Sequence, residues 1–135
     1  LLIQSQFEMF RGAPIHSAVE AFLVAESPLT LALIALTAVL LVPLGEELLF
    51  RSFLQPALQS WFGSWMGLLV CAAISGTAHA AASLGSVLPM FVLGVLLGIV
   101  YNQSRSLLAP LTLHVTHNGF TMLSVIVYRH LYVAG

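Results

Sequence analysis

Two neighbouring glutamates and an arginine form the most unusual cluster of ionisable side chains in this sequence. Glu46, Glu47 and Arg51 are the only charged residues between Ser27 and Ser104, and apolar residues flank them on both sides. On a helix, Glu47 and Arg51 share one face and can form an ion pair. Glu46 points about 100° away from Glu47 around the helix. It is therefore left without a cation in its own segment and is suited to accept a proton from water.

His79 supplies an imidazole that helical geometry brings to the depth of Glu46. If the chain reverses at Phe62 and Gly63, the two residues lie equally far from the turn on opposite arms of a hairpin. Both arms rise by about 1.5 Å per residue, so the two side chains reach the same level. We expect a separation of about 4–7 Å, which lets the carboxylate and the imidazole hold one water molecule between them. The less specific interpretation is a histidine that binds a backbone carbonyl.

A third group of polar side chains lies on the last apolar stretch. His114 and Asn118 are four residues apart and share a helical face, which His117 borders. Donors of these types that project into one cavity can stabilise the oxyanion that forms when a peptide carbonyl is attacked. The alternative is hydrogen bonding between helices, which is common for His and Asn in membrane bundles.

The composition indicates that lipid surrounds the elements that carry these residues. Apolar residues make up 59% and charged residues 7% of the 135 positions, whereas a soluble domain is about 25% charged. The chain has neither the basic patch of a nucleic-acid-binding protein nor the cysteine pairs of a disulfide-stapled domain. We therefore predict an integral, multi-pass membrane protein that lies in the lipid bilayer and binds no nucleic acid.

Apolar stretches of sufficient length predict an all-α transmembrane helix bundle with four membrane-crossing helices. The expected helices are residues 27–45, 65–82, 87–101 and 107–128. Pro43 and Gly45 are expected to loosen or kink the first helix just before the glutamates. A fifth crossing results if residues 46–59 cross separately after this kink. We predict a transmembrane domain over residues 27–135 and an N-terminal interfacial or linking segment over residues 1–26.

Small residues predict where two of these helices pack. Gly94 and Gly98 are spaced four apart on the third apolar stretch, a pattern that marks a close helix-packing face.

Taken together, the motifs resemble those of the CAAX-protease and bacteriocin-processing family, the Rce1-type or type II CAAX prenyl endopeptidases. Two motifs of this family are present in full, Glu-Glu-x-x-x-Arg at residues 46–51 and His-x-x-x-Asn at residues 114–118. A further motif ends at His79, with Ser75 at the position where the family has phenylalanine. The resemblance extends over residues 29–128.

The resemblance implies an intramembrane, glutamate-dependent endopeptidase that works without a cofactor. Its substrate would be a peptide or membrane protein, and the family name implies a prenylated C-terminal peptide as one such substrate. The roles implied residue by residue are water activation by Glu46 with His79, oxyanion binding by His114 with Asn118, and support of the first helix by Glu47 and Arg51.

Three other functions are compatible with the sequence. A zinc-dependent protease would draw its ligands from the glutamates and histidines of the motifs, but the chain has no His-Glu-x-x-His pair. A non-catalytic immunity or scaffold protein of the same fold would keep the polar cluster for packing or partner binding. A transporter would use Glu46 and His79 as a proton relay, although no second acidic helix is present.

Overall fold

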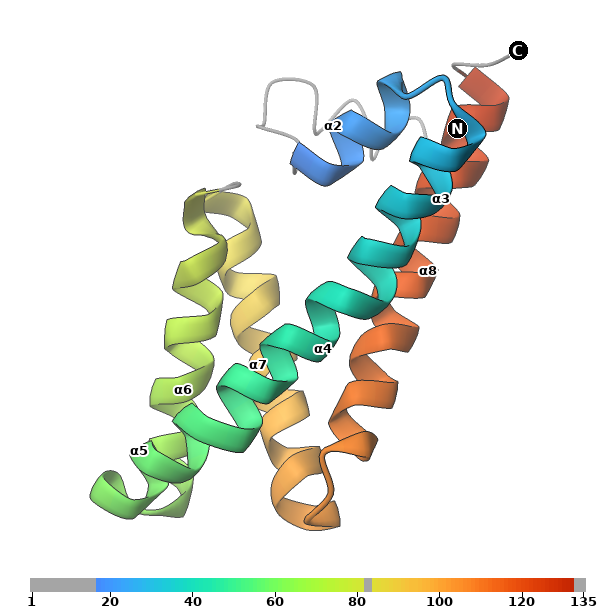
Figure 1. The fold of residues 1–135 in the computed structure, drawn as a ribbon. Helices are drawn as coiled ribbons and strands as arrows, with labels where there is room; N and C mark the ends of the chain where they lie inside the picture. The colour runs from blue at the N-terminus through green and yellow to red at the C-terminus, as the bar shows by residue number, and fades with distance from the viewer. Residues whose placement is uncertain (1–16, 82–83, 133–135) are drawn as a thin grey trace.

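The computed structural model describes residues 17–81 and 84–132, and every regular element in these ranges is helical (Figure 1). The predicted all-α class is therefore confirmed. Residues 1–16, most of the predicted N-terminal segment, lie outside the described residues. The end of that segment forms a short helix, α2 (Ser17–Val24).

One long helix runs without interruption from Pro28 to Phe62. Its successive parts are α3 (Pro28–Leu36), η1 (Thr37–Leu41), α4 (Val42–Glu47), η2 (Leu48–Leu54) and α5 (Gln55–Phe62). Pro28 stands in the first turn, where a missing backbone N–H leaves no hydrogen bond unmade. Because the helix continues past Glu46, residues 46–59 form part of the first helix and not a separate one.

Two prolines account for the two π-helical parts of the long helix. Pro43 follows η1, and Pro56 follows η2. A proline ring displaces the carbonyl four residues earlier and offers no N–H, so the neighbouring hydrogen bonds widen to a five-residue spacing. The N–H of Val42 accordingly donates to the carbonyl of Thr37. The loosening predicted at Pro43 is thus present, but it does not break the helix.

The chain reverses three times after the long helix (Figure 1). Gly63, with a φ of 82°, ends the long helix in a conformation that favours glycine. The elements that follow are α6 (Ser64–Ala78), the short 3₁₀ turns η3 (His79–Ala81) and η4 (Leu84–Ser86), α7 (Val87–Ser104) and α8 (Leu108–Tyr132). The helix α8 continues to Tyr132, four residues past the end predicted at residue 128.

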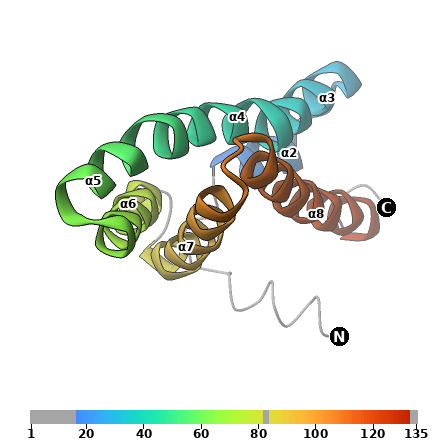
Figure 2. The same ribbon diagram turned by 90° about the horizontal axis from the view of Figure 1, so that it is seen from below.

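The long helix crosses the other helices rather than packing parallel to one of them. It contacts α8 through η1 and α4, and it contacts α6 through η2 and α5. Figure 1 shows its diagonal path from the C-terminal end of α8 to the start of α6. In Figure 2 the helices α6, α7 and α8 all lie on one side of it. The Glu-Glu-x-x-x-Arg motif therefore sits near the middle of this crossing.

Glycines allow α6 and α7 to approach closely. A Cβ atom added at Gly94 would lie 3.2 Å from the Cβ of Ala72, and one added at Gly98 would lie 3.0 Å from the Cγ of Leu68. Both glycines are buried. The packing role predicted for this pair of glycines is confirmed.

Two helices of the described ranges, Pro28–Phe62 and Leu84–Ser104, are long and apolar enough to cross a membrane. Ser64–Ala78 is a shorter apolar helix. The helix α8 is long enough, with 25 residues, but it carries more polar side chains and is not apolar enough to be counted with these two. Large apolar side chains such as Leu29 and Phe53 are about 70% exposed, as expected for surfaces that face lipid.

Candidate active site

Glu47 and Arg51 lie on the long helix and form a buried ion pair where this helix meets α7. Their side chains are 0% and 2% exposed, and the Nε of Arg51 lies 3.3 Å from the Oε2 of Glu47. This contact is an ion pair rather than an aligned hydrogen bond. The second Nη of Arg51 donates to the carbonyl of Gly94 at 3.0 Å. Because both side chains are almost fully buried, each charge depends on the other for compensation.

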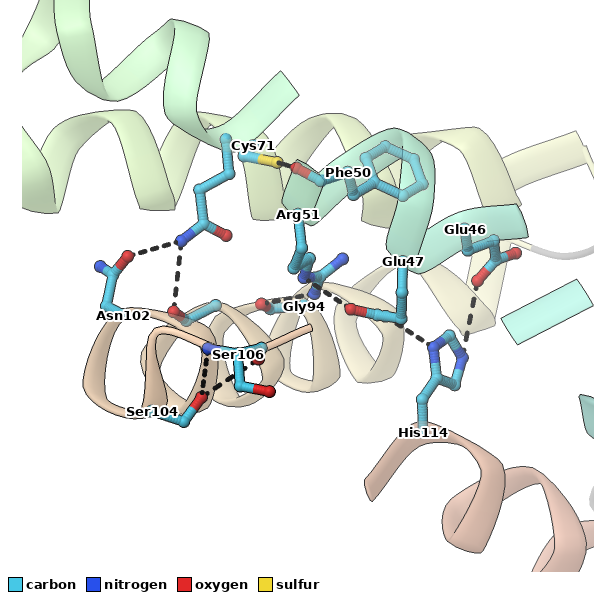
Figure 3. A network of polar contacts seen from close by, with 12 residues as sticks. Glu46, Glu47, Phe50, Arg51, Cys71, Gly94, Asn102, Ser104, Ser106 and His114 are labelled. Atoms are coloured by element: carbon cyan, nitrogen blue, oxygen red, sulfur yellow. Dashed lines mark hydrogen bonds and ion pairs between the residues drawn. The ribbon is translucent and has the colours of Figure 1, made fainter. Parts of the chain in front are cut away.

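His114, on α8, lies between the two glutamates (Figure 3). Its Nδ1 is 2.8 Å from the Oε1 of Glu47, and its Nε2 is 3.5 Å from the Oε2 of Glu46. The imidazole is buried. Because the carboxylate of Glu47 is paired with Arg51 and can only accept, Nδ1 is the donor in this contact. In the neutral ring, Nε2 is then an acceptor that faces Glu46.

His79 approaches the same carboxylate from the end of α6. Its Nε2 lies 3.5 Å from the Oε1 of Glu46, and about a quarter of each side chain is exposed. Its Nδ1 donates to the carbonyl of Ser75 at 2.9 Å. A carbonyl oxygen can only accept, so the neutral ring again presents Nε2 as an acceptor toward Glu46.

The contact between Glu46 and His79 agrees with the equal depth predicted from a turn at Gly63. The separation of 3.5 Å is shorter than the 4–7 Å that we expected, so the two groups are in direct contact. A water molecule that touches both would sit beside the contact rather than between the two atoms.

The carboxylate of Glu46 is therefore enclosed by one imidazole nitrogen on each oxygen. The three side chains come from the long helix, the end of α6 and α8, which are far apart in the sequence. With His79 neutral, a water molecule beside this contact can donate one proton toward the Glu46 carboxylate and the other toward the Nε2 of His79. The carboxylate is the anionic acceptor of the two, so it is the group suited to take a proton from that water.

Asn118 lies on α8 but makes its polar contacts away from Glu46. Its Nδ2 donates to the carbonyl of Ala38 at 3.0 Å, and its Oδ1 accepts from the Nδ1 of His117 at 3.2 Å. Ala38 precedes Glu46 by about two helical turns. The amide therefore ties α8 to the long helix, and its second N–H remains for another acceptor. The oxyanion role of Asn118 stays a prediction.

The sequence analysis missed a second buried polar cluster next to the ion pair. Gln55 is 1% exposed, and its Nε2 donates to the carbonyl of Gly98 and to the Oδ1 of Asn102. Gln59 donates to the same oxygen of Asn102. A pattern in the sequence could have revealed this cluster: polar residues recur every four positions after Glu47, at Arg51, Gln55 and Gln59. This cluster holds the long helix against α7.

Comparison with known proteins gives the family of the chain. No curated protein and no solved structure matches it. Residues 28–120 match the family described as type II CAAX prenyl endopeptidase Rce1-like. The matched range is more than half of the chain and includes every residue of the two complete motifs. This chain belongs to the Rce1-like family of type II CAAX prenyl endopeptidases.

Proposed function

We propose that this chain is an intramembrane endopeptidase in which Glu46 acts as the general base. The observation that carries the proposal is the contact of each Glu46 oxygen with the Nε2 of a different histidine at 3.5 Å. A carboxylate in this position can take a proton from water and later return it to a leaving amine. Membership of the family supports peptidase chemistry in general.

In the first step, Glu46 and His79 bind a water molecule and Glu46 accepts one of its protons. The water oxygen forms a bond to the carbonyl carbon of the substrate, and the carbonyl electrons move onto the oxygen. The ring of His79 is fixed by its bond to the Ser75 carbonyl, so its Nε2 keeps facing the reacting water.

The resulting oxyanion is stabilised by His114 and Asn118. In this proposal His114 enters the reaction as an imidazolium, so its Nε2 donates to the oxyanion while its Nδ1 stays bonded to Glu47. Asn118 donates through the N–H that Ala38 does not use. Glu47 and Arg51 support this arrangement by fixing His114 and the long helix.

In the second step, Glu46 returns its proton to the nitrogen of the scissile peptide bond. The carbon–nitrogen bond breaks, and the oxyanion electrons restore the carbonyl. The products are a carboxylic acid and an amine, so one water molecule is consumed for each bond that is cleaved.

The proposal includes a multi-pass arrangement within the bilayer and a membrane-associated peptide or protein as the substrate. The long helix, α6, α7 and α8 would form four crossings of one domain over residues 27–135, preceded by an interfacial segment over residues 1–26. Aromatic side chains support this, because Trp61 and Trp65 are exposed at the turn between the long helix and α6. The family name suggests a prenylated C-terminal peptide as the first substrate to test.

The exchange His79→Ala tests the proposed base pair. We expect kcat for hydrolysis of a fluorescence-quenched, prenylated peptide to fall on the order of 10²-fold, because the water loses one of its acceptors. Thr77→Ala is the matched control, since Thr77 is exposed on the same helix and bonds only its own helical carbonyls. Equal losses in the two variants would contradict a role for His79 in catalysis.

Treatment with a strong chelator separates the proposed mechanism from a zinc-dependent one. We expect purified protein to keep its full rate of hydrolysis in excess EDTA and 1,10-phenanthroline. The reason is that Glu47 is occupied by Arg51 and His114, and no group of three or more His, Cys, Asp or Glu side chains among the described residues is arranged to hold a metal ion. Loss of activity that zinc alone restores would replace the metal-free mechanism with the metal-dependent alternative.

A further inference from the structure

A hollow of about 320 Å³ lies where α2, the start of the long helix and the last turns of α8 meet. Phe22, Leu31, Ala35 and Ile126 supply apolar walls, and Arg129 and His130 are the polar residues of the lining. Ala35 precedes Glu46 on the same helix by about 16 Å along the axis. The hollow is therefore separate from the candidate active site.

Arg129 brings to this hollow a positive charge that forms no ion pair within the described part of the chain. It donates one N–H to the carbonyl of Ala25, and its guanidinium lies 5.9 Å from the ring centroid of Phe22. Its Nε has no hydrogen-bond partner, and no glutamate of the described residues forms an ion pair with it. A guanidinium has five N–H donors. One is bonded to Ala25 and the Nε–H is buried, so the three other N–H groups on the Nη atoms are those that can bind an anion.

The position of Arg129 corresponds to the edge of the apolar part of the fold. The rings of Tyr128 and Tyr132 lie beside it on α8, with centroids 5.1 Å apart. Tyrosine is enriched where hydrocarbon gives way to the lipid headgroups. The exposed Trp61 and Trp65 lie at the opposite end of the long helix, and Figure 1 shows that the two ends are far apart.

We propose that this hollow binds an anionic phospholipid, with the phosphate at Arg129 and one acyl chain against the apolar walls. Three features favour this ligand: a cation that pairs with no anion among the described residues, walls of aliphatic and aromatic carbon, and two tyrosines beside the cation, as is usual at a membrane interface. Basic pockets between transmembrane helices bind lipid headgroups through this combination. The volume lies in the range of sites for small molecules, so it can hold part of one lipid.

Lipid retention by the purified full chain tests this proposal. The protein in a neutral detergent is mixed with phosphatidylglycerol or phosphatidylcholine, and the bound lipid is counted by native mass spectrometry. We expect phosphatidylglycerol to be retained in preference to phosphatidylcholine. Arg129→Gln should lower its retention at least about fivefold, the effect of one arginine near a lipid surface. Arg105→Gln, which changes an exposed arginine in the turn between α7 and α8, should not change retention.

A second variant keeps Arg129 and fills the hollow instead. Ala32 is exposed on α3 and lines the hollow, so Ala32→Phe should keep the helix and lower retention of phosphatidylglycerol. Leu33→Phe is the matched control, because Leu33 is exposed on the same helix but outside the lining. Inorganic phosphate at millimolar concentration should not displace the lipid, whereas a site for free phosphate would release it.

Two results would overturn the proposal. One is equal retention of the two lipids, and the other is retention of phosphatidylglycerol that neither Arg129→Gln nor Ala32→Phe lowers. Preferential binding of an apolar peptide through its free carboxylate would instead assign the hollow to a peptide. Glu46→Gln should retain lipid like the unaltered chain, so failure of the proposed catalysis leaves this test unaffected.

Discussion

We expect the exchange Glu46→Gln to reduce peptide hydrolysis on the order of 10²- to 10⁴-fold. Glutamine keeps the shape of the side chain and one oxygen acceptor, but its amide cannot take a proton from water. Both histidine nitrogens that face Glu46 can still contact the new side chain, so the helices should remain in place. The measurement is kcat for a fluorescence-quenched, prenylated peptide with protein in detergent.

The matched control is Glu20→Gln, which removes one carboxylate from the exposed face of α2. It should hydrolyse the peptide at the rate of the unaltered chain. Circular dichroism and unfolding in a denaturing detergent should give the same result for all three proteins. Hydrolysis that persists in Glu46→Gln would refute the proposed base. Unchanged cellular function in that variant would favour a non-catalytic scaffold or immunity protein.

The parts of the site that depend on helical geometry alone could be predicted from the sequence. The pairing of Glu47 with Arg51 follows from a spacing of four on one helix face. The meeting of Glu46 with His79 follows from equal rise on the two arms of a hairpin that turns at Gly63. Both predictions need only the helix period and the position of one glycine.

The place of His114 could not be predicted in the same way. It binds both glutamates, although its spacing from Asn118 suggested only that these two residues act together. Its position depends on how α8 crosses the long helix, and a sequence pattern gives no crossing angle.

The continuity of the long helix was also hidden in the sequence. Pro43 and Gly45 commonly end or bend helices, so a break before Glu46 was the natural expectation. Widened hydrogen bonds in η1 accommodate the proline instead. Contacts with α8 on both sides of this point hold the helix together, and such contacts are a property of the folded bundle.

We expect the exchange Arg51→Met to lower the free energy of unfolding by about 3–5 kcal/mol, the usual cost of removing one partner from a buried ion pair. Methionine fills a similar space, so the loss reports charge rather than a cavity. The carboxylate of Glu47 would stay fully buried with only His114 as its partner, and the carbonyl of Gly94 would lose its donor. Unfolding in a denaturing detergent, followed by circular dichroism, measures the change.

A double exchange distinguishes a lost charge partner from a general loss of packing. Glu47→Gln combined with Arg51→Met removes both charges, and the glutamine oxygen can still accept from the Nδ1 of His114. We expect it to recover most of the stability lost in the single variant, because buried ion pairs replaced by neutral side chains often cost little. Arg105→Met should stay within about 0.5 kcal/mol of the unaltered chain, since Arg105 is exposed. If the double variant is no more stable than Arg51→Met, the prediction is wrong. The pair then stabilises the fold through packing, and the unpaired charge of Glu47 is not the cause of the lost stability.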